Sequence, residues 1–500
     1  MGIPHVKCGR GRASLQTWSS GESLDSQPLV VDLDGTLVHT DMLHETSLRV
    51  LRDSPWDLLR LSGWLMQGKA VVKQNLATRA RFDPQHLPYN EPLLHWLREQ
   101  RAAGRKLVLC TASDAAVANS VAGHLGIFDE VMASDGSQNL GGRVKAEALV
   151  ALYGNRGFDY VGNSATDLPV WQHARKGVVV NGSDALARQA GGICDVEKVF
   201  PRLPTSVMVW RRVLRVHQWL KNVLLFIPLL AAHQFADTAI WGALGLAFLS
   251  FSLCASSVYI FNDLLDLESD RAHPRKRERP FASGSVPVWT GVVLSPVLLV
   301  ISFALATRVG GNFLPWLAFY FILTCAYSWT LKRLMLVDCL ALAMLYTVRI
   351  VAGAAAAGLA LSFWLLAFAV FLFLSLAFVK RYAELEVQVV SGNTKVHGRG
   401  YYTTDAGLIQ TLGVTSGYGA VLVLALYLNS EAVLRLYATP EIMWAAVLVL
   451  LFWISWMWLQ AHRGNMHDDP LVYAVKDKAS LAAGAVFAVV LGLGAIGWRW

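Results

Sequence analysis

The chain has 500 residues, of which 54% are hydrophobic and 16% are charged. This composition is too apolar for an ordinary soluble protein and too highly charged for a chain that lies in a membrane throughout. Basic loops beside membrane-spanning helices explain the net charge of +8 more simply than a nucleic-acid site does, so we expect no nucleic-acid partner.

The apolar residues are concentrated in the second part of the chain. Polar and apolar segments alternate before about Pro204, whereas long uncharged segments dominate after it. Residues 1–21 are polar and contain no signal-peptide core, so we expect the first part to stay in the cytoplasm. The predicted organisation is an N-terminal extension (1–26), an α/β domain (27–195), a linker (196–208) and an all-α membrane domain (209–500).

Three short apolar segments of the first part are predicted to be strands, and polar residues follow each of them. The first strand ends in two aspartates and a glycine turn. A lysine follows a glycine-rich segment before the third strand. The strands and their polar residues are 29–31 with Asp32 and Asp34, 106–110 with Thr111, and 158–162 with Asn163 and Asp167, and the lysine is Lys145.

The motif Asp-x-Asp-Gly-Thr at 32–36, followed by the other three segments in order, resembles the haloacid-dehalogenase (HAD) phosphatase superfamily. The resemblance extends from about residue 27 to residue 190 and implies a Rossmann-like α/β fold, a phosphatase reaction and a bound Mg²⁺. Asp32 would be the nucleophile that forms an aspartyl-phosphate. Asp34 would be the general acid and base.

The same resemblance implies that the Thr111 hydroxyl binds the phosphate and that Lys145 neutralises the nucleophile and the phosphate. The superfamily usually has an aspartate where Asn163 stands. An amide oxygen can still bind Mg²⁺ but lacks the charge, so we expect Asp167 to hold the ion. A domain that has kept the fold but lost the activity remains the alternative. The residues expected at this metal site are Asp32, Asp34, Asn163 and Asp167.

Residues 39–104, between the first two strands, are predicted to be helical and to form a small cap over the site. The segment 56–66 in this insertion has an apolar face. That face would either pack in the core of the cap or contact a lipid-linked substrate or the bilayer surface. We favour core packing.

The second part contains about nine apolar segments, judged against the roughly 20 residues of a membrane-spanning helix. The first is short unless it begins near Val209. Basic residues are concentrated in every second loop, so the positive-inside rule predicts that these loops and the N-terminal domain lie on the cytoplasmic side of the inner membrane and that Trp500 lies outside. The expected spans are 219–232, 239–261, 288–307, 313–330, 336–358, 363–378, 409–428, 442–459 and 481–498.

The second span ends in Asn-Asp-Leu-Leu-Asp-Leu-Glu-Ser-Asp at 262–270. On a helix the asparagine and the three aspartates share one face, and carboxylates crowded there need a cation. Hard oxygen ligands favour Mg²⁺, which commonly also binds substrate phosphates. The basic segment 271–279 follows directly, so acids for a metal lie beside bases for a diphosphate. The expected ligands are Asp263, Asp266 and Asp270, of which Asp263 and Asp266 would be catalytic.

This motif, with Arg-x-His-Pro-x-Lys-x-x-Arg-Pro-x-Ala-Ser-Gly at 271–284, resembles the UbiA superfamily of intramembrane transferases. The resemblance extends from residue 203 to residue 500. Quinone- and heme-type prenyltransferases of the superfamily carry a second motif, Asp-x-x-x-Asp, where this chain has only Asp338. That departure and the segment Lys-Arg-Tyr-Ala-Glu-Leu at 380–385 are more similar to the polyprenyl-phosphate phosphoribosyltransferase branch.

The resemblance to this branch implies 5-phosphoribosyl 1-diphosphate and a polyprenyl phosphate as substrates. Since ionisable groups inside a bilayer are costly, basic residues within the spans favour a functional role. The residues expected to bind substrate are Lys221, Asn222, Asn262, Arg271, Lys276, Arg279, Lys332, Arg349, Lys380, Arg381 and Tyr382.

A two-step enzyme combines both resemblances. The membrane domain would make polyprenyl-phosphoryl 5-phosphoribose, and the HAD-like domain would remove the 5-phosphate. The alternative is a UbiA-type prenyltransferase that attaches a prenyl group to an aromatic acceptor and carries a regulatory or inactive HAD domain. The lone Asp338 argues against this alternative.

Overall fold

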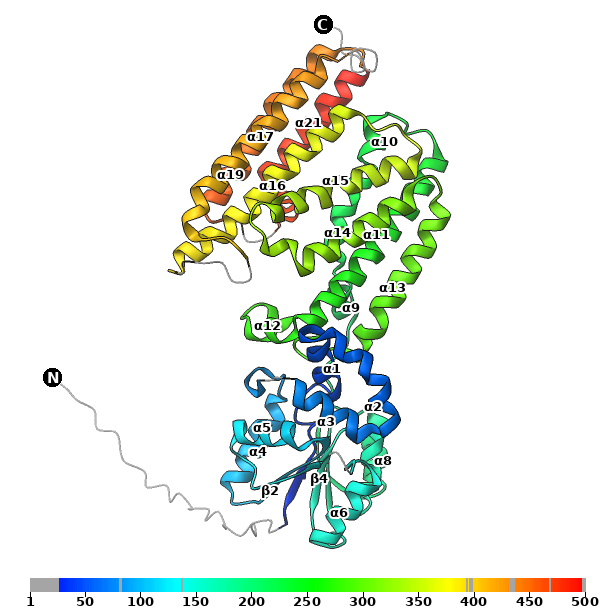
Figure 1. Cartoon of the computed structure of the whole chain (residues 1–500), viewed down its shortest axis with the longest axis vertical. Helices are drawn as coiled ribbons and strands as arrows, with labels where there is room; N and C mark the ends of the chain where they lie inside the picture. The colour runs from blue at the N-terminus through cyan, green and yellow to red at the C-terminus, as the bar shows by residue number, and fades with distance from the viewer. Residues whose placement is uncertain are drawn as a thin grey trace, which may run out of the picture. The chain divides into compact units, whose positions relative to one another are not determined.

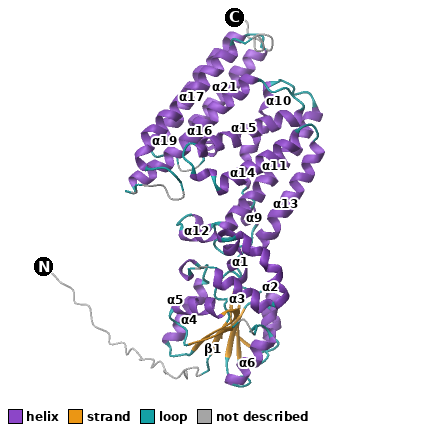
Figure 2. Cartoon of the chain, viewed as in Figure 1, coloured by secondary structure: helices purple, strands orange, loops and turns teal. Residues whose placement is uncertain are grey.

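The computed structural model describes residues 27–80, 83–135, 138–392, 394, 399–430, 437–466 and 469–496. The chain divides into two compact units, Met1–Leu203 (unit 1) and Pro204–Trp500 (unit 2). Figures 1 and 2 show that strands belong to the N-terminal part of the chain and that helices make up the rest. The predicted N-terminal extension (1–26) and Trp500 lie outside the described residues.

Unit 1 contains a six-stranded parallel sheet in the order β3-β2-β1-β4-β5-β6. Its central strands are continuous apolar segments because both faces are covered. Val30 belongs to one core cluster, whereas Leu29 and Val31 belong to the other. The predicted Rossmann-like α/β fold is confirmed. The strands are β1 (Leu29–Val31), β2 (Leu107–Asp114), β3 (Glu130–Ser134), β4 (Asp159–Gly162), β5 (Lys176–Val180) and β6 (Asp195–Phe200).

Helices lie on both sides of the strands in Figure 2, and local signals set their ends. The side chain of Asp114 at the end of β2 accepts a hydrogen bond from Ala116 N and so caps α5, which ends at Gly126 in the left-handed region. The helices of the sheet domain are α4 (Glu91–Ala102), α5 (Ala115–Leu125), α6 (Arg143–Tyr153), α7 (Leu168–Trp171) and α8 (Asp184–Gly191).

The insertion between β1 and β2 begins with three helices that form the predicted cap: α1 (Met42–Asp53), α2 (Leu61–Gln67) and α3 (Lys69–Arg79). The cap has a small core of its own, to which Trp64 contributes. Trp56 and Met66, by contrast, are exposed. The apolar segment of the cap therefore contributes to both its core and its surface.

The sheet extends beyond the predicted end of the domain at residue 195. β6 pairs in parallel with β5 and occupies the first half of the predicted linker 196–208, and α9 (Val207–Val213) begins before that linker ends. Most side chains of β6 are exposed, because it is an edge strand. Its sequence therefore lacks the apolar pattern by which buried strands are recognised.

Unit 2 consists of helices, and the described part of it has seven that are long and apolar enough to span a membrane. An eighth candidate is a pair of helical segments bent by 58°, and a shorter apolar helix, α14, lies at the fourth expected span, 313–330. The prediction of a multi-pass membrane domain is confirmed, although residues 497 and 498 of the last expected span lie outside the described residues. The spans are α11 (Thr238–Leu265), α13 (Val288–Val309), α14 (Phe313–Trp329), α15 (Val337–Ala357), α16 (Phe363–Val390), α17 (Ala406–Leu428), α19 (Trp444–His462) and α21 (Lys478–Ile496), preceded by the bent pair α9 with η4 (Val216–Phe226) and α10 (Ile227–Ala231).

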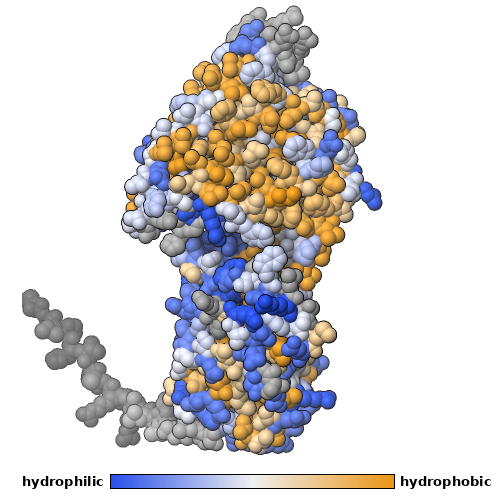
Figure 3. Space-filling view, in the orientation of Figure 1, coloured by the Kyte–Doolittle hydropathy of each residue, from blue (hydrophilic) through white to orange (hydrophobic). Residues whose placement is uncertain are grey.

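The face of unit 2 drawn in Figure 3 is largely apolar. Val300, Leu422 and Leu448 are among the strongly exposed apolar side chains of this unit. This is the surface expected of helices that face lipid. Polar groups are instead paired between helices, where a hydrogen bond replaces contact with water.

Two serine pairs join α11 to α13. Ser250 Oγ donates to Ser302 O at 2.8 Å, and Ser302 Oγ donates to Ser250 O at 2.7 Å. Ser257 and Ser295 repeat the arrangement at 2.7 and 3.0 Å. The pairs fix the register of α11, whose end carries the predicted aspartate motif.

Candidate active sites

The first candidate site lies at the carboxyl ends of β1 and β4 in unit 1. The strand order reverses at β1, because β2 and β3 lie on one side and β4 to β6 on the other. Such switch points open a crevice for ligands. The crevice is a cleft of about 600 Å³, which suits a substrate much larger than phosphate alone. Among the residues that line it are Asp32, Asp34, Lys145, Asn163, Asp167 and Lys73 of the cap.

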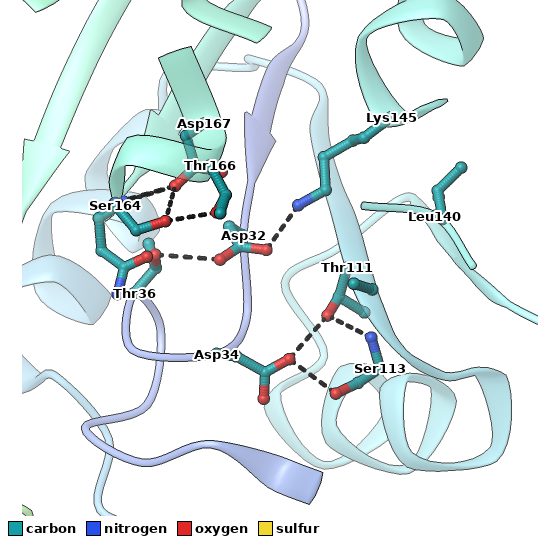
Figure 4. A network of polar contacts seen from close by, with 12 residues as sticks. Asp32, Asp34, Thr36, Thr111, Ser113, Leu140, Lys145, Ser164, Thr166 and Asp167 are labelled. Carbon is teal, nitrogen blue, oxygen red and sulfur yellow. Dashed lines mark hydrogen bonds and ion pairs between the residues drawn. The ribbon is translucent and has the colours of Figure 1, made fainter. Parts of the chain in front are cut away.

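Asp32 forms an ion pair with Lys145 of α6, with 2.7 Å between Oδ1 and Nζ (Figure 4). Thr36 donates a hydrogen bond from Oγ1 to Oδ2 of Asp32 at 3.3 Å. Burial raises the pKa of Asp32 to about 7, although the Lys145 ammonium acts in the opposite direction. The Asp32 carboxylate is thus held beside a cation, which suits a nucleophile that attacks phosphorus.

Asp34 is held by three hydrogen bonds. Its Oδ1 accepts from Met42 N at 2.8 Å, and its Oδ2 accepts from Ser113 Oγ at 2.7 Å and from Thr111 Oγ1 at 3.2 Å. Burial raises the pKa of Asp34, as a general acid at neutral pH requires. Thr111 is fully buried, so its hydroxyl orients this acid in the structure, whereas the sequence suggested a phosphate ligand.

Asp167, the residue expected to hold Mg²⁺, accepts hydrogen bonds from its own turn. Its Oδ2 accepts hydrogen bonds from the backbone N–H groups of Asn163 and Ser164 at 3.0 Å each, and its Oδ1 accepts one from Tyr160 OH at 2.8 Å. The carboxylate therefore stabilises the turn after β4. An aspartate four residues beyond a strand can reach back to that turn, which the motif alone did not reveal.

The remaining oxygen donors fit a magnesium ion that binds together with phosphate. Asn163 lies against the turn at Gly35, where a Cβ would come within 2.1 Å of Asn163 Nδ2 and φ is +73°. Within the described ranges, no three acidic, histidine or cysteine side chains converge in a group that could hold a metal. Mg²⁺ needs few protein ligands when substrate phosphate completes its shell, so Asp32 and Asn163 are the residues that fit.

Sequence reasoning missed three polar residues of this site. Ser113 lies two residues after Thr111 at the end of the same strand, so its side chain could have been predicted from the sequence to point into the site. Tyr160 OH accepts a hydrogen bond from Lys145 Nζ at 3.0 Å and thereby links this lysine to Asp167. Lys73 comes from the cap, and no local pattern marked it.

The second candidate site lies at the end of α11 in unit 2. Asp263 is buried and pairs with Arg215 and, at 3.1 Å, with Arg279. Asp270 pairs with the same Arg279 at 2.6 Å. Burial raises the pKa of Asp270, and its Oδ1 is buried without a hydrogen-bond partner. A buried, unsatisfied carboxylate oxygen beside a second carboxylate fits a cation.

The predicted aspartate motif does not form one continuous helix. α11 ends at Leu265 and α12 (Leu267–Ala272) begins after Asp266, so Asp266 lies at the junction. Burial lowers the pKa of Lys332, and Asp266 is close enough to oppose this effect. Asn262 donates a hydrogen bond from Nδ2 to Ser328 Oγ of α14 at 2.9 Å. The helix is thus interrupted at Asp266, while Asp263 and Asp270 on either side of the break still meet at Arg279.

Two further predicted bases lie in the loop after α12. Arg271 donates from Nε to the carbonyl oxygen of Ala282 at 2.9 Å, whereas Lys276 is exposed to solvent. Throughout the described part of unit 2, no group of three potential metal-ligating acids, histidines or cysteines is present. Asp263 and Asp270 nevertheless fit an ion that arrives with a diphosphate, because substrate oxygens then supply the other ligands.

Asp338, the lone residue at the place of the second aspartate motif, is committed to an ion pair. Its Oδ2 lies 2.7 Å from Arg381 Nη2, and neither side chain is exposed. Tyr401 OH donates to Oδ1 of Asp338 at 2.5 Å. In the structure Arg381, expected to bind substrate, is thus engaged by an acid of a neighbouring helix. Tyr382 OH bonds to His462 Nδ1 at 2.9 Å and likewise packs between helices.

Lys380, one position earlier on α16, points to a different group because neighbouring helical residues are rotated by about 100°. Its Nζ lies 3.3 Å from Oδ2 of Asp469, and Lys221 Nζ lies 2.8 Å from the same oxygen. Tyr346 OH donates to Asp469 at 3.0 Å. Burial acts to raise the pKa of Asp469, but Lys380 and Lys221 hold it below its usual range. Sequence reasoning missed Asp469 because it lies in a distant loop.

Arg349 and Asn222 form a separate buried group. Arg349 Nε donates to Asn222 Oδ1 at 2.9 Å, and Arg349 Nη2 donates to Tyr320 OH at 3.0 Å. Asn222 donates in turn to Ser252 Oγ at 2.9 Å. The side chains that accept these hydrogen bonds from Arg349 are neutral, and Arg349 and Lys221 lie over the same ring, that of Tyr346. Unit 2 therefore holds buried cationic charge at this place. Such charge favours an anionic ligand.

Known proteins resemble this chain over different parts of its length. The model of the UbiA prenyltransferase family matches residues 223–482. An uncharacterized protein of Sinorhizobium fredii, y4nM, is 38% identical over 465 residues, which cover 92% of this chain and 90% of the relative. The decaprenyl-phosphate phosphoribosyltransferase of Mycolicibacterium smegmatis is 31% identical over 275 residues, 53% of this chain and 86% of that enzyme.

One solved structure matches about a third of the chain. A substrate-bound phosphoserine phosphatase complex covers 35% of this chain and 93% of its own, with 14% identity and a TM-score of 0.25. The family match extends over the helices that carry Asp263, Asp338 and Lys380. The chain therefore belongs to the UbiA prenyltransferase family, as a multi-pass membrane transferase whose helices follow an α/β unit.

Proposed function

We propose that unit 2 transfers the 5-phosphoribosyl group of 5-phosphoribosyl 1-diphosphate to a polyprenyl phosphate, and that unit 1 then removes the 5-phosphate. The observation that carries the first step is the buried pair of Asp338 and Arg381, which leaves Asp263 and Asp270 as the candidate acid site among the described residues of unit 2. One acid site is sufficient to bind the diphosphate of a water-soluble sugar donor. The similarity to decaprenyl-phosphate phosphoribosyltransferases supports the same substrates.

In the transfer, a phosphate oxygen of the lipid forms a bond to C1 of the ribose while the bond from C1 to the diphosphate breaks. Arg215 and Arg279 neutralise the departing diphosphate, for which their guanidinium groups are suited. Magnesium would add charge neutralisation at Asp263 and Asp270. Lys221 and Lys380 are suited to bind the acceptor phosphate, which approaches from the lipid side.

In the second step, an Asp32 oxygen attacks the 5-phosphate and the bond from phosphorus to the ribose oxygen breaks. Asp34 gives its proton to that oxygen and then takes a proton from the water that hydrolyses the aspartyl-phosphate. Lys145 compensates the negative charge of Asp32 and of the transferred group. The products are inorganic phosphate and the lipid-linked ribose.

The two steps require both sites on one side of the inner membrane. The alternation of basic and neutral loops supports a cytoplasmic position for unit 1 and for the loop after α11. The donor is highly charged and water-soluble, so we expect it to reach the membrane from the cytoplasm, on the same side as the two sites.

The test uses the purified full chain in nanodiscs with Mg²⁺, labelled 5-phosphoribosyl 1-diphosphate and decaprenyl phosphate. Mass spectrometry of the extracted lipid should detect lipid-linked ribose from the wild type and lipid-linked ribose 5-phosphate from Asp32→Asn. Asp263→Ala should give neither product, because the diphosphate site loses a carboxylate.

Two outcomes would contradict the proposal. Identical phosphorylated lipid from wild type and Asp32→Asn would mean that unit 1 is not the second enzyme. Transfer of a prenyl group from dimethylallyl or farnesyl diphosphate to an aromatic acceptor, with no phosphoribosyl transfer, would establish the other UbiA reaction instead.

A further inference from the structure

A carboxylate of this chain lies between the two lysines of unit 2 that are suited to bind the acceptor phosphate. Lys221 and Lys380, from η4 and α16, place their Nζ atoms 2.8 and 3.3 Å from Oδ2 of Asp469. Tyr346 OH of α15 lies 3.0 Å from each oxygen of the same carboxylate. Asp469 thus makes the contacts that the oxygens of a bound phosphate would make with two ammonium groups and a phenol.

The carboxylate and a phosphate cannot use Lys221 at the same time. The side chains of Lys221 and Asp469 are only 10% and 8% exposed, so there is little room for a further anion at this ammonium group. The side chain of Lys380 is 29% exposed, so a ligand can reach Lys380 first. A phosphate that binds to Lys221 must therefore displace Asp469.

The charges at this place favour the exchange when the ligand is a phosphate monoester. Arg349 and Lys221 lie 5.8 and 5.6 Å from the centre of the Tyr346 ring, so a third cation lies beside the same phenol. Asp469 supplies one negative charge to these cations, whereas a phosphate monoester in its place supplies two. A phosphate diester supplies one and therefore neutralises no more charge than Asp469 does.

A second acid, Glu384, also acts on the charge of Lys380. Its carboxylate pairs with Arg381 of the same helix and lies 3.1 Å from Arg399 Nε. Glu384 is thus held by two arginines. The carboxylate in contact with both lysines is that of Asp469.

Asp469 lies outside the spanning helices. It caps the short helix α20 (Pro470–Lys476), which lies between the spans α19 and α21, and its Oδ1 accepts a hydrogen bond from Leu471 N at 3.3 Å. Displacement of this carboxylate therefore requires a change in the connection between two spans and leaves the spans themselves in place.

We propose that Asp469 competes with the acceptor of unit 2 for its binding site. The phosphate monoester of the polyprenyl phosphate takes the place of the carboxylate and is bound by Lys221, Lys380 and Tyr346. This inference rests on the proposed function, because it specifies how the acceptor of that reaction binds. It adds Tyr346 to the residues that bind the acceptor, and it makes Asp469 the counterion of the lysines when no lipid phosphate is bound.

Binding of labelled farnesyl phosphate to the full chain in nanodiscs tests the competition, after partition into empty nanodiscs is subtracted. An ion-paired state that holds about 90% of the wild-type molecules weakens the apparent affinity about tenfold. Asp469→Asn should therefore lower the Kd about tenfold. It should lower the KM for decaprenyl phosphate to a similar extent and leave the KM for the phosphoribosyl donor unchanged.

Two further variants accompany this one. Asp469→Ser should act in the same way, because serine, like asparagine, can cap α20 without the charge. Asp477→Asn is the matched control, since it makes the same change on the same connection, where Asp477 accepts hydrogen bonds from Trp456 Nε1 and Ser480 Oγ. Its Kd should stay at the wild-type value.

Tyr346→Phe distinguishes competition from a structural role. In the wild type the phenol bonds to Asp469 in the free state and to the phosphate in the bound state, so its removal should change the Kd little. In the Asp469→Asn background only the bound state offers the phenol a charged acceptor. There, Tyr346→Phe should raise the Kd about tenfold, as expected for one hydrogen bond to a charged group.

The choice of ligand identifies what takes the place of Asp469. The wild type should bind farnesyl phosphate more tightly than its methyl diester, and an equal concentration of inorganic phosphate should not displace it. Equal affinity for the diester, or displacement by inorganic phosphate, would overturn the assignment to a lipid phosphate monoester.

The outcomes separate this inference from the function on which it rests. Unchanged or weaker binding of farnesyl phosphate in both Asp469→Asn and Asp469→Ser would overturn the competition, and so would a lower KM for the donor in place of the acceptor. Tighter binding in both variants, without phosphoribosyl transfer to decaprenyl phosphate by any of the proteins, would contradict the proposed function while the lipid phosphate site stands.

Discussion

An amide at position 163 gives the cleft of unit 1 one negative charge fewer than an aspartate would. We predict that Asn163→Asp lowers the Mg²⁺ concentration for half-maximal phosphate release about tenfold, because a carboxylate binds a hard cation more strongly than an amide does. Titration of phosphate release with Mg²⁺ measures the change. Asn163→Ala should shift it in the opposite direction, and an unchanged midpoint in both variants would exclude Asn163 as a ligand.

His39 is a residue whose protonation should affect the stability of unit 1. Asn181 Nδ2 donates to Gly35 O at 2.8 Å and lies 3.2 Å from His39 Nδ1, so that ring nitrogen accepts and carries no proton. Burial lowers the pKa of His39 below its usual value of about 6.5. The unfolded chain therefore binds a proton below pH 6.5 that the folded unit does not bind, and stability falls as the pH falls.

We expect the stability of a fragment ending at Leu203 to decrease below about pH 6.5 by up to about 1.4 kcal/mol per pH unit through His39. Urea unfolding followed by tryptophan fluorescence at pH 5 to 8 measures this slope. His39→Gln should make the slope shallower. The same slope in both proteins would mean that other groups cause the pH dependence.

At the scale of elements, α15 and α16 are joined by the Asp338–Arg381 pair. Removing one partner of a buried pair costs about 3–5 kcal/mol where the other charge is left uncompensated. Arg381 also pairs with Glu384, so the loss on removing Asp338 should be smaller. We predict that Asp338→Asn lowers the thermal unfolding temperature of the purified chain by several degrees, while the Mg²⁺ dependence of transfer by the folded fraction stays unchanged. A large rise in the Mg²⁺ requirement at an unchanged unfolding temperature would instead make Asp338 a metal ligand.

The short helix α20 (Pro470–Lys476) is tied to three other elements through Asp469. In Asp469→Ala, Lys221 and Lys380 lose their shared counterion, and we expect a loss of about 3 kcal/mol in the free energy of unfolding. Combining it with Lys221→Met removes one of the two repelling charges and should recover part of the loss. A double-mutant cycle on thermal unfolding measures this coupling, and additive losses would contradict it.

At the scale of the whole molecule, hydrophobic pattern predicted most of the architecture. The strands before Asp32 and Asn163 and the long apolar helices were recognisable because burial on both faces, or in lipid, demands continuous apolar segments. β6 was missed because an exposed edge strand does not need a continuous apolar segment. Asp469 and Lys73 were missed because contacts between distant segments leave no local pattern. The pairing of Arg381 with Asp338 was not predicted for the same reason, since the two residues are 43 positions apart in sequence.

The arrangement across the membrane is also open to test. The nine expected spans and the basic loops on one side predict that the two ends of the chain lie on opposite sides. Green fluorescent protein fused to the N-terminus should fluoresce, and alkaline phosphatase fused after residue 496 should be active in intact bacteria. Inactive alkaline phosphatase with a fluorescent C-terminal fusion would mean an even number of spans.

The reciprocal serine pairs between α11 and α13 restrict how unit 2 can move. Ser250 and Ser257 are spaced by one heptad, and so are Ser302 and Ser295, so sliding α11 along α13 breaks four hydrogen bonds at once. In lipid the freed hydroxyl and carbonyl groups find no water to replace them. The helix that carries Asp263 is therefore held in a fixed position along α13. The opening needed to admit a lipid headgroup must come from movement of elements other than α11 and α13.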